Sequence, residues 1–204
     1  MNRKVKLIVV LSAILIISIA VNGCSTKKDQ QDQNVGSTNN SEPVEENDEE
    51  NIDDIGMIKL PDFNLKDLEG NQVSSDIFRD YDMTIVSIWQ STCGPCIEEL
   101  EALNVIYNEY KDKDVNVLGI SVDNVEVVGE EGVKELVETL ELEFTNVIAD
   151  EDYLIKLIDY VQGTPTAFIL GKEGELLTEP RVGSNGTESD IKDFKNIIEE
   201  IQKD

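Results

Sequence analysis

The chain has 204 residues and carries 43 acidic against 17 basic side chains, which gives a formal net charge of −26. This surplus of carboxylates excludes a nucleic-acid partner, because binding a phosphate backbone needs clustered Lys and Arg. The chain has no histidine, which excludes Ser-His-Asp and Cys-His catalysis and histidine-containing metal sites. The length leaves room for one folded domain of about 150 residues.

The first 23 residues are expected to be an export signal. Three basic residues within the first six are followed by an apolar run over 7–21 that only two serines interrupt. This run is short for a membrane-spanning helix, which needs about 20 apolar residues. The pattern therefore favours a cleaved signal peptide, and an uncleaved membrane anchor is the alternative.

Cys24 is the odd one among three cysteines, since one intramolecular disulfide uses only two. The residues Val21-Asn22-Gly23 before it resemble a bacterial lipobox, in which the cysteine is acylated and becomes the new N-terminus. Gly23 fits this pattern, whereas Asn22 and Val21 are less usual there. The resemblance implies lipidation of Cys24, and the alternative is a cysteine that merely follows an uncleaved anchor. Acyl chains, at about 0.8 kcal/mol for each buried methylene, would hold the protein at the membrane without a spanning helix.

Residues 24–56 are expected to be a lipidated N-terminus followed by a disordered acidic linker. The segment 25–56 has ten acidic residues, two lysines and no aromatic residue. Such a composition buries too little apolar surface to offset the entropy lost on ordering. We therefore expect the folded domain over 57–204.

Within this domain, apolar periodicity predicts alternating strands and helices. We expect strands over 63–68 and 72–74, joined by a turn at 69–71 into a hairpin, and over 83–89, 115–122, 144–149, 167–170 and 175–182. We expect helices over 75–78, from the cysteine pair to about 111, and over 133–140, 150–161 and 187–203. Gly119 within a strand suggests a close backbone approach. The strand–helix–strand order predicts a parallel sheet with crossovers, and the last two strands read as an antiparallel hairpin.

Two cysteines stand two residues apart in Trp89-Gln90-Ser91-Thr92-Cys93-Gly94-Pro95-Cys96, where a predicted strand passes into a predicted helix. Unpaired N–H groups and the positive dipole end of a helix favour an anion, so we expect Cys93 to be a nucleophilic thiolate near neutral pH. Cys96, one turn into the helix, is expected to be more buried and to resolve a mixed disulfide. The alternatives are a static disulfide and a structural zinc half-site, which would need carboxylates or a second chain to complete it. We expect neither a metal nor a cofactor.

With these motifs the chain resembles the thioredoxin superfamily and, within it, the membrane-tethered TlpA/ResA-like thiol-disulfide oxidoreductases. The resemblance covers 58–203 and rests on Trp89-x-x-x-Cys93-Gly94-Pro95-Cys96 after a strand, on Gly163-Thr164-Pro165 before a later strand, and on a strand–helix insertion between them. It implies an α/β fold, with a central mixed sheet flanked by helices and an N-terminal β-hairpin. It also implies that Pro165 is cis and faces the cysteines, and that Thr164, Pro165 and Trp89 bind substrate.

Glu99 is the predicted proton carrier. At 100° per residue it falls at the edge of the helix arc that Cys96 and the apolar residues occupy, so its carboxylate should be partly desolvated, with a raised pKa, and able to exchange a proton with Cys96. TlpA/ResA-like proteins similarly carry a glutamate three residues after the second cysteine. Ser87 stands where thioredoxin has a buried aspartate, which favours Glu99 as the relay, and Thr92 replaces a tryptophan of thioredoxin. The alternative is a surface glutamate in an acidic helix.

The resemblance implies a lipid-anchored protein on the extracytoplasmic face of the bacterial cell membrane, which reduces or exchanges disulfides of exported proteins. It also implies a membrane thiol relay as electron donor. The Gly-Pro dipeptide is similar to that of thioredoxin, whose potential is about −270 mV, so we expect a reductant. One rival is a thiol-dependent peroxidase of the redoxin, AhpC/TSA type, which expects a lone cysteine in a Thr-x-x-Cys context near an arginine; Arg79 and Arg181 stand in unmatched contexts. The other is a non-enzymatic redox chaperone or copper carrier, and copper carriers of this fold space their cysteines by three and add a histidine.

Overall fold

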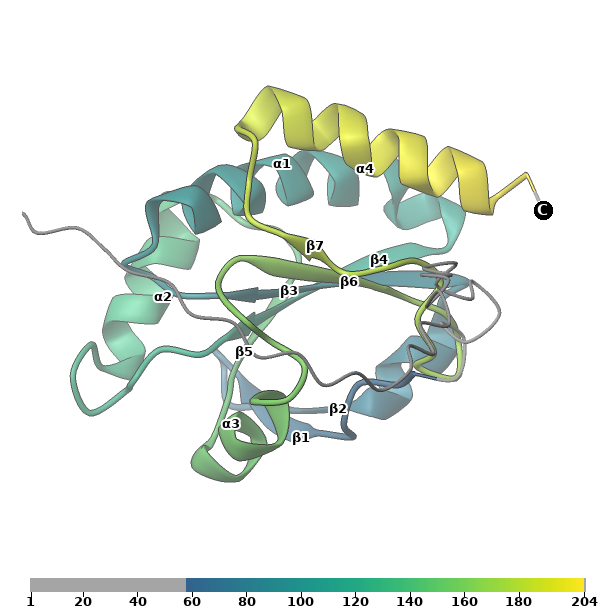
Figure 1. Ribbon diagram of the computed structural model, residues 1–204. Helices are drawn as coiled ribbons and strands as arrows, with labels where there is room; N and C mark the ends of the chain where they lie inside the picture. Colours follow the sequence, from purple (N-terminus) through teal and green to yellow (C-terminus); the bar gives the residue numbers. More distant parts are fainter. Residues whose placement is uncertain (1–57, 204) are drawn as a thin grey trace, which may run out of the picture. The chain divides into compact units, whose positions relative to one another are not determined.

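The computed structural model describes residues 58–203 (Figure 1). The export signal, Cys24 and the linker expected over 1–56 lie outside these residues. Within 58–203, none of the helices combines the length and apolar character needed to cross a bilayer.

A mixed sheet of seven strands, in the order β2-β1-β5-β4-β3-β6-β7, forms the centre of the domain (Figure 1). The strands are β1 (Asn64–Asp67), β2 (Gln72–Ser74), β3 (Met83–Trp89), β4 (Val115–Ser121), β5 (Thr145–Ile148), β6 (Thr166–Leu170) and β7 (Arg181–Val182). The central strands β3, β4 and β5 are parallel, and all other pairs are antiparallel. This arrangement confirms the predicted mixed α/β sheet with parallel crossovers and an N-terminal hairpin.

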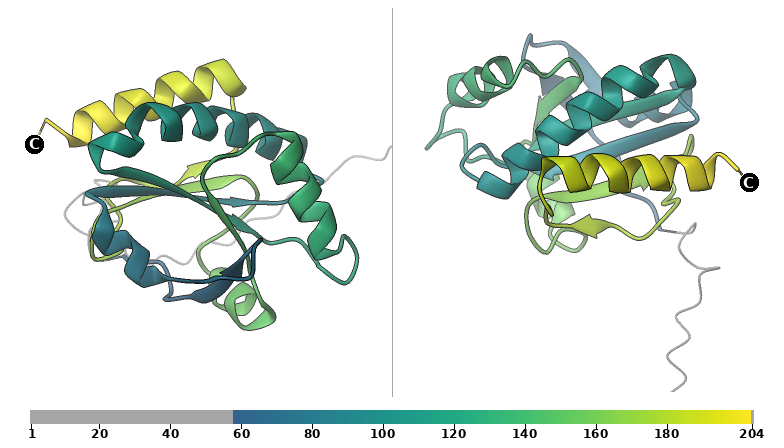
Figure 2. Two further views of the ribbon diagram at one scale, coloured as in Figure 1. Left: turned by 180° about the vertical axis from the view of Figure 1, so that it is seen from behind. Right: turned by 90° about the horizontal axis from the view of Figure 1, so that it is seen from above.

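Helices cover both faces of the sheet. They are α1 (Gly94–Tyr110), α2 (Glu130–Thr139), α3 (Glu151–Leu157) and α4 (Thr187–Ile201), with short 3₁₀ segments η2 (Ser75–Asp80) and η3 (Lys111–Lys113). α4 lies alongside α1 on one face, as the view from above shows (Figure 2), and α3 lies on the opposite face (Figure 1). The inward-facing side chains of these two helices, such as Ile106, Phe194 and Ile198, are therefore fully shielded from solvent.

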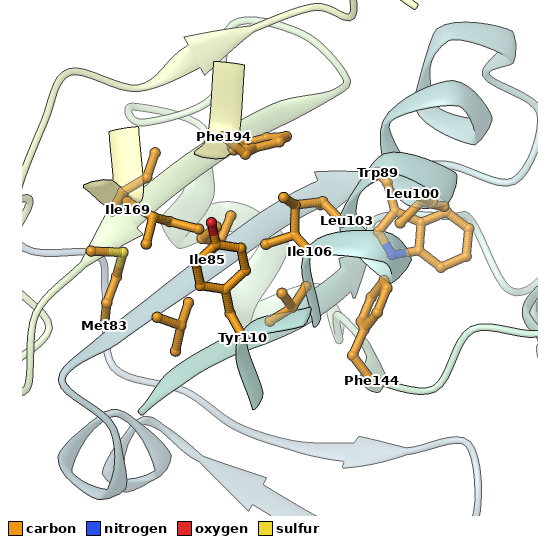
Figure 3. Close-up of a cluster of buried hydrophobic side chains, with 14 of the residues drawn as sticks. Met83, Ile85, Trp89, Leu100, Leu103, Ile106, Tyr110, Phe144, Ile169 and Phe194 are labelled. Atoms are coloured by element: carbon orange, nitrogen blue, oxygen red, sulfur yellow. The ribbon is translucent and has the colours of Figure 1, made fainter. Parts of the chain in front are cut away.

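β3 is buried along its whole length and supplies both hydrophobic cores. Successive side chains of a strand point to opposite faces, so Met83, Ile85 and Trp89 pack beneath α1 and α4, while Val86 and Ile88 pack on the other side. Figure 3 shows the first of these cores, in which side chains of β3, α1 and α4 meet. Because the alternation places position 87 on the same face as positions 85 and 89, the hydroxyl of Ser87 points toward α1.

Gly119 on β4 allows the close approach that its position suggested. A Cβ atom added there would lie 1.9 Å from the side-chain oxygen of Asn146 and 2.9 Å from the indole nitrogen of Trp89. Gly119 also pairs with Ser87 on β3. The sheet is thus tightly filled directly below the start of α1.

Two elements end or break several residues short of their predicted bounds, whereas the other elements agree with prediction to within about three residues at each end. α3 ends at Leu157 rather than at 161, although Val161 still packs against the core on this face. The strand expected over 175–182 is reduced to two isolated bridges, at Glu175 and Leu176, and to β7. Pro180, just before β7, has no N–H to donate to a ladder, which accounts for the interruption.

Candidate active site

The two cysteines of the Cys-Gly-Pro-Cys motif form a disulfide at the start of α1. Cys93 is the N-cap residue, in extended backbone conformation, and Pro95 lies in the first turn, where a missing N–H has no intrahelical partner to lose. Cys96 is fully buried, whereas Cys93 is only partly so. This confirms the predicted difference in burial; the roles of nucleophile and resolving thiol stay predictions.

The surroundings of Cys93 favour a thiolate when the disulfide is reduced. The backbone N–H of Cys96 points at the sulfur of Cys93, at 3.3 Å. The 17-residue helix directs its positive dipole end at the same sulfur, and its first turn has no acidic residue despite the acidity of the chain. Both effects stabilise an anion at this position.

The Thr164–Pro165 peptide bond is cis and faces the cysteines, as predicted. The carbonyl oxygen of Thr164 lies 3.6 Å from Cys93 Sγ, although the two residues are 71 positions apart. The Thr164 hydroxyl also donates to the side-chain oxygen of Gln90, at 3.5 Å. The loop before β6 and the loop before α1 therefore meet at the partly exposed sulfur.

Asp123 is a residue of this site that sequence reasoning left in a loop. It is 3% exposed, and its carboxylate accepts hydrogen bonds from the Ser91 N–H (2.9 Å), the Ser91 hydroxyl (2.8 Å) and the Ser121 hydroxyl (2.8 Å). The signal for it was its place directly after a buried parallel strand, since the carboxyl ends of such strands share one edge of the sheet. Asp123 thereby fixes the loop that ends at Cys93.

We expect Asp123→Ala to lower the free energy of unfolding by about 1–3 kcal/mol, because it leaves the polar groups of Ser91 and Ser121 without their acceptor. Urea unfolding checks this. Glu126→Ala, which removes an exposed carboxylate from the same loop, is the control and should change stability by less than about 0.5 kcal/mol. Equal stability of the two variants would refute the anchoring role of Asp123.

Glu99 is buried more deeply than predicted: its exposed fraction is 0%. The helical wheel placed it at the edge of the apolar arc of α1, but α4 packs alongside α1 (Figure 2) and Arg181 reaches the carboxylate. The Ser87 hydroxyl donates to Glu99 Oε2 at 2.6 Å. Burial raises the pKa of Glu99 to about 7, against the lowering effects of the Ser87 hydrogen bond and of Arg181. The predicted raised pKa is thus confirmed.

Arg181 and Asp190 complete a buried charge cluster around Glu99, and sequence reasoning missed both roles. The Nη2 atom of Arg181 donates to Asp190 at 2.9 Å and to Asp193 at 3.4 Å, and Nη1 faces Glu99 at 3.7 Å. The guanidinium also lies 4.5 Å from the ring centroid of Phe194. The available signal was the spacing of Asp190, which precedes Phe194 by one helical turn and so shares its buried face.

The predicted substrate contact of Trp89 is wrong for this conformation. Trp89 is completely buried in the core below α1 (Figure 3). The reason is its position: as the last residue of β3 it points to the α1 face of the sheet. Thr164 remains partly exposed, whereas Pro165 is buried behind it. Within 58–203, no group of three or more Cys, Asp or Glu side chains is placed to hold a metal ion.

Comparison with known proteins gives a consistent picture at the level of sequence. The model of the AhpC/TSA family matches residues 58–178, which is more than half of the chain. The thiol-disulfide oxidoreductase ResA of Bacillus thuringiensis subsp. konkukian is 28% identical over 121 residues, which cover 59% of this chain and 66% of the relative. ResA of Geobacillus thermodenitrificans is 28% identical over 138 residues, or 68% and 75% of the two chains. The first of these matches spans just under two thirds of the relative's length.

Solved structures show the same fold. StoA from Bacillus subtilis superposes with a TM-score of 0.52 at 25% identity, covering 64% of this chain and 93% of that one. The thioredoxin domain of a thiol-disulfide oxidoreductase from Bacteroides vulgatus gives a TM-score of 0.56 at 25% identity, with coverages of 69% and 95%. These likenesses confirm the thioredoxin-like fold.

Proposed function

Because the chain belongs to the AhpC/TSA family, and its thioredoxin-like fold places a cysteine pair at a helix start, we propose that it is a thiol-disulfide oxidoreductase. The observation that carries this proposal is the geometry of Cys93. Its sulfur is partly exposed, receives the N–H of Cys96 and lies against the Thr164 carbonyl, while its disulfide partner is buried.

In the proposed reaction, the reduced protein passes an electron pair to a substrate disulfide. The Cys93 thiolate attacks one substrate sulfur, the substrate S–S bond breaks, and the other substrate sulfur leaves as a thiolate that takes a proton from water. Cys96 then loses its proton to the Glu99 carboxylate and attacks Cys93. The mixed disulfide breaks, the second substrate thiolate departs, and the Cys93–Cys96 disulfide is left.

Glu99 suits the role of proton acceptor by position and by acidity. Cys96 and Glu99 are three residues apart on α1, so their side chains are neighbours on one face of the helix. A carboxyl whose pKa is about 7 can both accept and return a proton near neutral pH.

We further propose where the protein acts and with what. The expected signal over 1–23 and the expected lipidation of Cys24 support a position on the extracytoplasmic face of the bacterial membrane. The acidic segment 25–56 would then act as a tether, and the substrates would be disulfide-bonded exported proteins. A reductant in that compartment needs a membrane thiol relay to renew its dithiol.

A thiol-dependent peroxidase of the AhpC/TSA type is the second candidate, because the family model that matches this chain is that of the AhpC/TSA family. The arginines argue against it. The guanidinium of Arg181 is committed to Asp190, Asp193 and Glu99. Arg79 is exposed and pairs with Asp76 at 3.0 Å. Both guanidinium groups are thus already paired with carboxylates.

The two candidates are separated by giving the pre-reduced protein either a quenched fluorescent peptide disulfide or hydrogen peroxide. We expect one peptide disulfide reduced per protein molecule, little loss of peroxide, and a reduction potential near the −270 mV of thioredoxin. Faster oxidation by peroxide than by the peptide would favour the peroxidase. A potential above about −180 mV, that of protein disulfide isomerase, would contradict a reductant.

A further inference from the structure

Two buried polar atoms of the charge cluster around Glu99 face each other without a hydrogen bond. Glu99 Oε1 and Arg181 Nη1 both lack a hydrogen-bond partner and lie 3.7 Å apart. The side chain of Glu99 is 0% exposed and that of Arg181 is 16% exposed. Buried polar groups are almost always paired, so an open contact between two opposite charges at this position needs a physical explanation.

We propose that Arg181 and Asp190 form a buried counter-charge couple that sets the protonation of Glu99, and thereby its proton exchange with Cys96. The part of this proposal that concerns Cys96 rests on the proposed function. Arg181 and Asp190 act through Glu99 and are positioning residues.

The hydrogen bonds of Arg181 explain why the contact with Glu99 is open. Its Nη2 atom is held by two carboxylates of α4, Asp190 at 2.9 Å and Asp193 at 3.4 Å. Asp190 is itself fixed, since it accepts from the Ser184 hydroxyl at 2.6 Å and from the Asn185 N–H at 3.1 Å. The guanidinium is therefore anchored on the α4 side and reaches Glu99 only at more than hydrogen-bond length.

The charges around Glu99 act in opposite directions. Arg181 from β7 lowers the pKa of Glu99 and Asp190 from α4 raises it. Asp193, one turn further along α4, faces Arg181 and competes for the same cation. β3 contributes only the uncharged Ser87, and Cys96 is the neighbour on α1 itself. When Glu99 ionises, three carboxylates share one guanidinium. The ease with which Glu99 loses its proton therefore depends on how much of the new negative charge Arg181 can neutralise.

Because the two charges act in opposite directions, removing one or the other should shift the pKa of Glu99 with opposite signs. Removing the cation in Arg181→Gln should raise the pKa of Glu99, and removing the competing anion in Asp190→Asn should lower it. In Arg181→Gln, which removes a cation 3.7 Å from Glu99, we expect the pKa of Glu99 to rise by about one or more, and in Asp190→Asn we expect a shift in the opposite direction. Arg181→Lys keeps the cation and should restore most of the wild-type value. If Arg181 and Asp190 had a purely structural role, the two substitutions would not shift the pKa of Glu99 in opposite directions.

The direct readout is ¹³C NMR titration of the Glu99 carboxyl in the reduced full chain, assigned by its absence in Glu99→Gln. Asp193→Asn is the second anionic variant in case Asp190→Asn fails to fold, because Asp193 is 40% exposed. It should lower the pKa of Glu99 by a smaller amount. Lys195→Gln is the matched control, since the Lys195–Glu109 pair also joins α4 to α1 but lies outside the cluster.

Opposite shifts in the two classes of variant, with the pH profile of mixed-disulfide resolution moving the same way, support the proposal. The proposal is overturned if the pKa of Glu99 is unchanged in Arg181→Gln, or if it shifts as much in Lys195→Gln. Neither outcome would bear on the proposed disulfide reduction by the wild-type protein. If the wild-type protein reduces no disulfide, the proposed function fails instead, and the titrations still decide whether the charge couple exists.

Discussion

Replacing Cys93 with Ser should lower the rate of disulfide reduction by about 10³-fold or more, whereas Cys96→Ser should stop the reaction at a covalent intermediate. A serine at position 93 cannot attack a disulfide, and the loss of a nucleophile costs nearly all of the rate when the catalytic groups act as a unit. With Cys96→Ser, Cys93 still attacks but no second thiol can displace the substrate. The asymmetry between the two variants follows from the burial of Cys96 and the exposure of Cys93.

Non-reducing mass spectrometry after incubation with a peptide disulfide checks this. Cys96→Ser should gain the mass of one half of the peptide disulfide. Cys93→Ser should gain no mass. All variants should carry Cys24→Ser as well, so that the third cysteine of the chain cannot contribute an adduct. Equal trapping by both single variants would mean that the two sulfurs are equally reachable, and the assignment of roles would fall.

Glu99→Gln should slow resolution of the mixed disulfide by about 10²-fold and should make the protein more stable at alkaline pH. The first effect follows because glutamine keeps the shape of the side chain but cannot accept a proton. The second follows from linkage. The pKa of Glu99 is raised from 4.5 to about 7, so between these values the folded state binds the proton that the unfolded state has lost, and stability falls as pH rises.

The expected size of this stability effect is about 3 kcal/mol, because a tenfold change in the acid dissociation constant corresponds to roughly 1.4 kcal/mol. The advantage of Glu99→Gln over the wild type should therefore grow between about pH 4.5 and pH 7 and stay constant above pH 7. Urea unfolding of both proteins at several pH values measures it. Glu98→Gln, at the exposed neighbouring position, is the matched control and should show no such growth. A pH-independent difference for Glu99→Gln would show that the carboxyl titrates normally.

The central part of the fold could be predicted because each element has a strong local pattern. β3 is rich in β-branched and aromatic residues, and α1 follows it with apolar residues at helical spacing. The hairpin of β1 and β2 was marked by its turn at 69–71. The end of α3 and the gap before β7 were not predicted, because the ends of helices and strands depend on tertiary contacts that a local pattern does not carry. Pro180 was the available signal for the gap before β7.

The candidate site was predictable only where sequence neighbours create it. Cys93, Cys96 and Glu99 lie within two turns of one helix, so spacing alone related them. The charged residues around Glu99 come from β7 and α4, some 80 to 90 residues later, whereas its hydrogen-bond partner Ser87 lies on β3. These charged residues meet Glu99 because α4 packs against α1. Amphipathic periodicity indicates that α4 has a buried face, but it does not say which residues of α1 that face contacts. The same reason explains the error at Trp89, whose burial is decided by what covers its face of the sheet.

Alkylation of the reduced protein tests the central claim most directly, which is that the sulfur of Cys93 is ionised and accessible at the start of α1. At pH 6, iodoacetamide should label Cys93 at least about 10-fold faster than it labels a cysteine in an unstructured peptide, because only the thiolate reacts. Cys96 should remain unlabelled while the protein is folded. Labelling of Cys93 at the rate of the peptide cysteine would contradict the account.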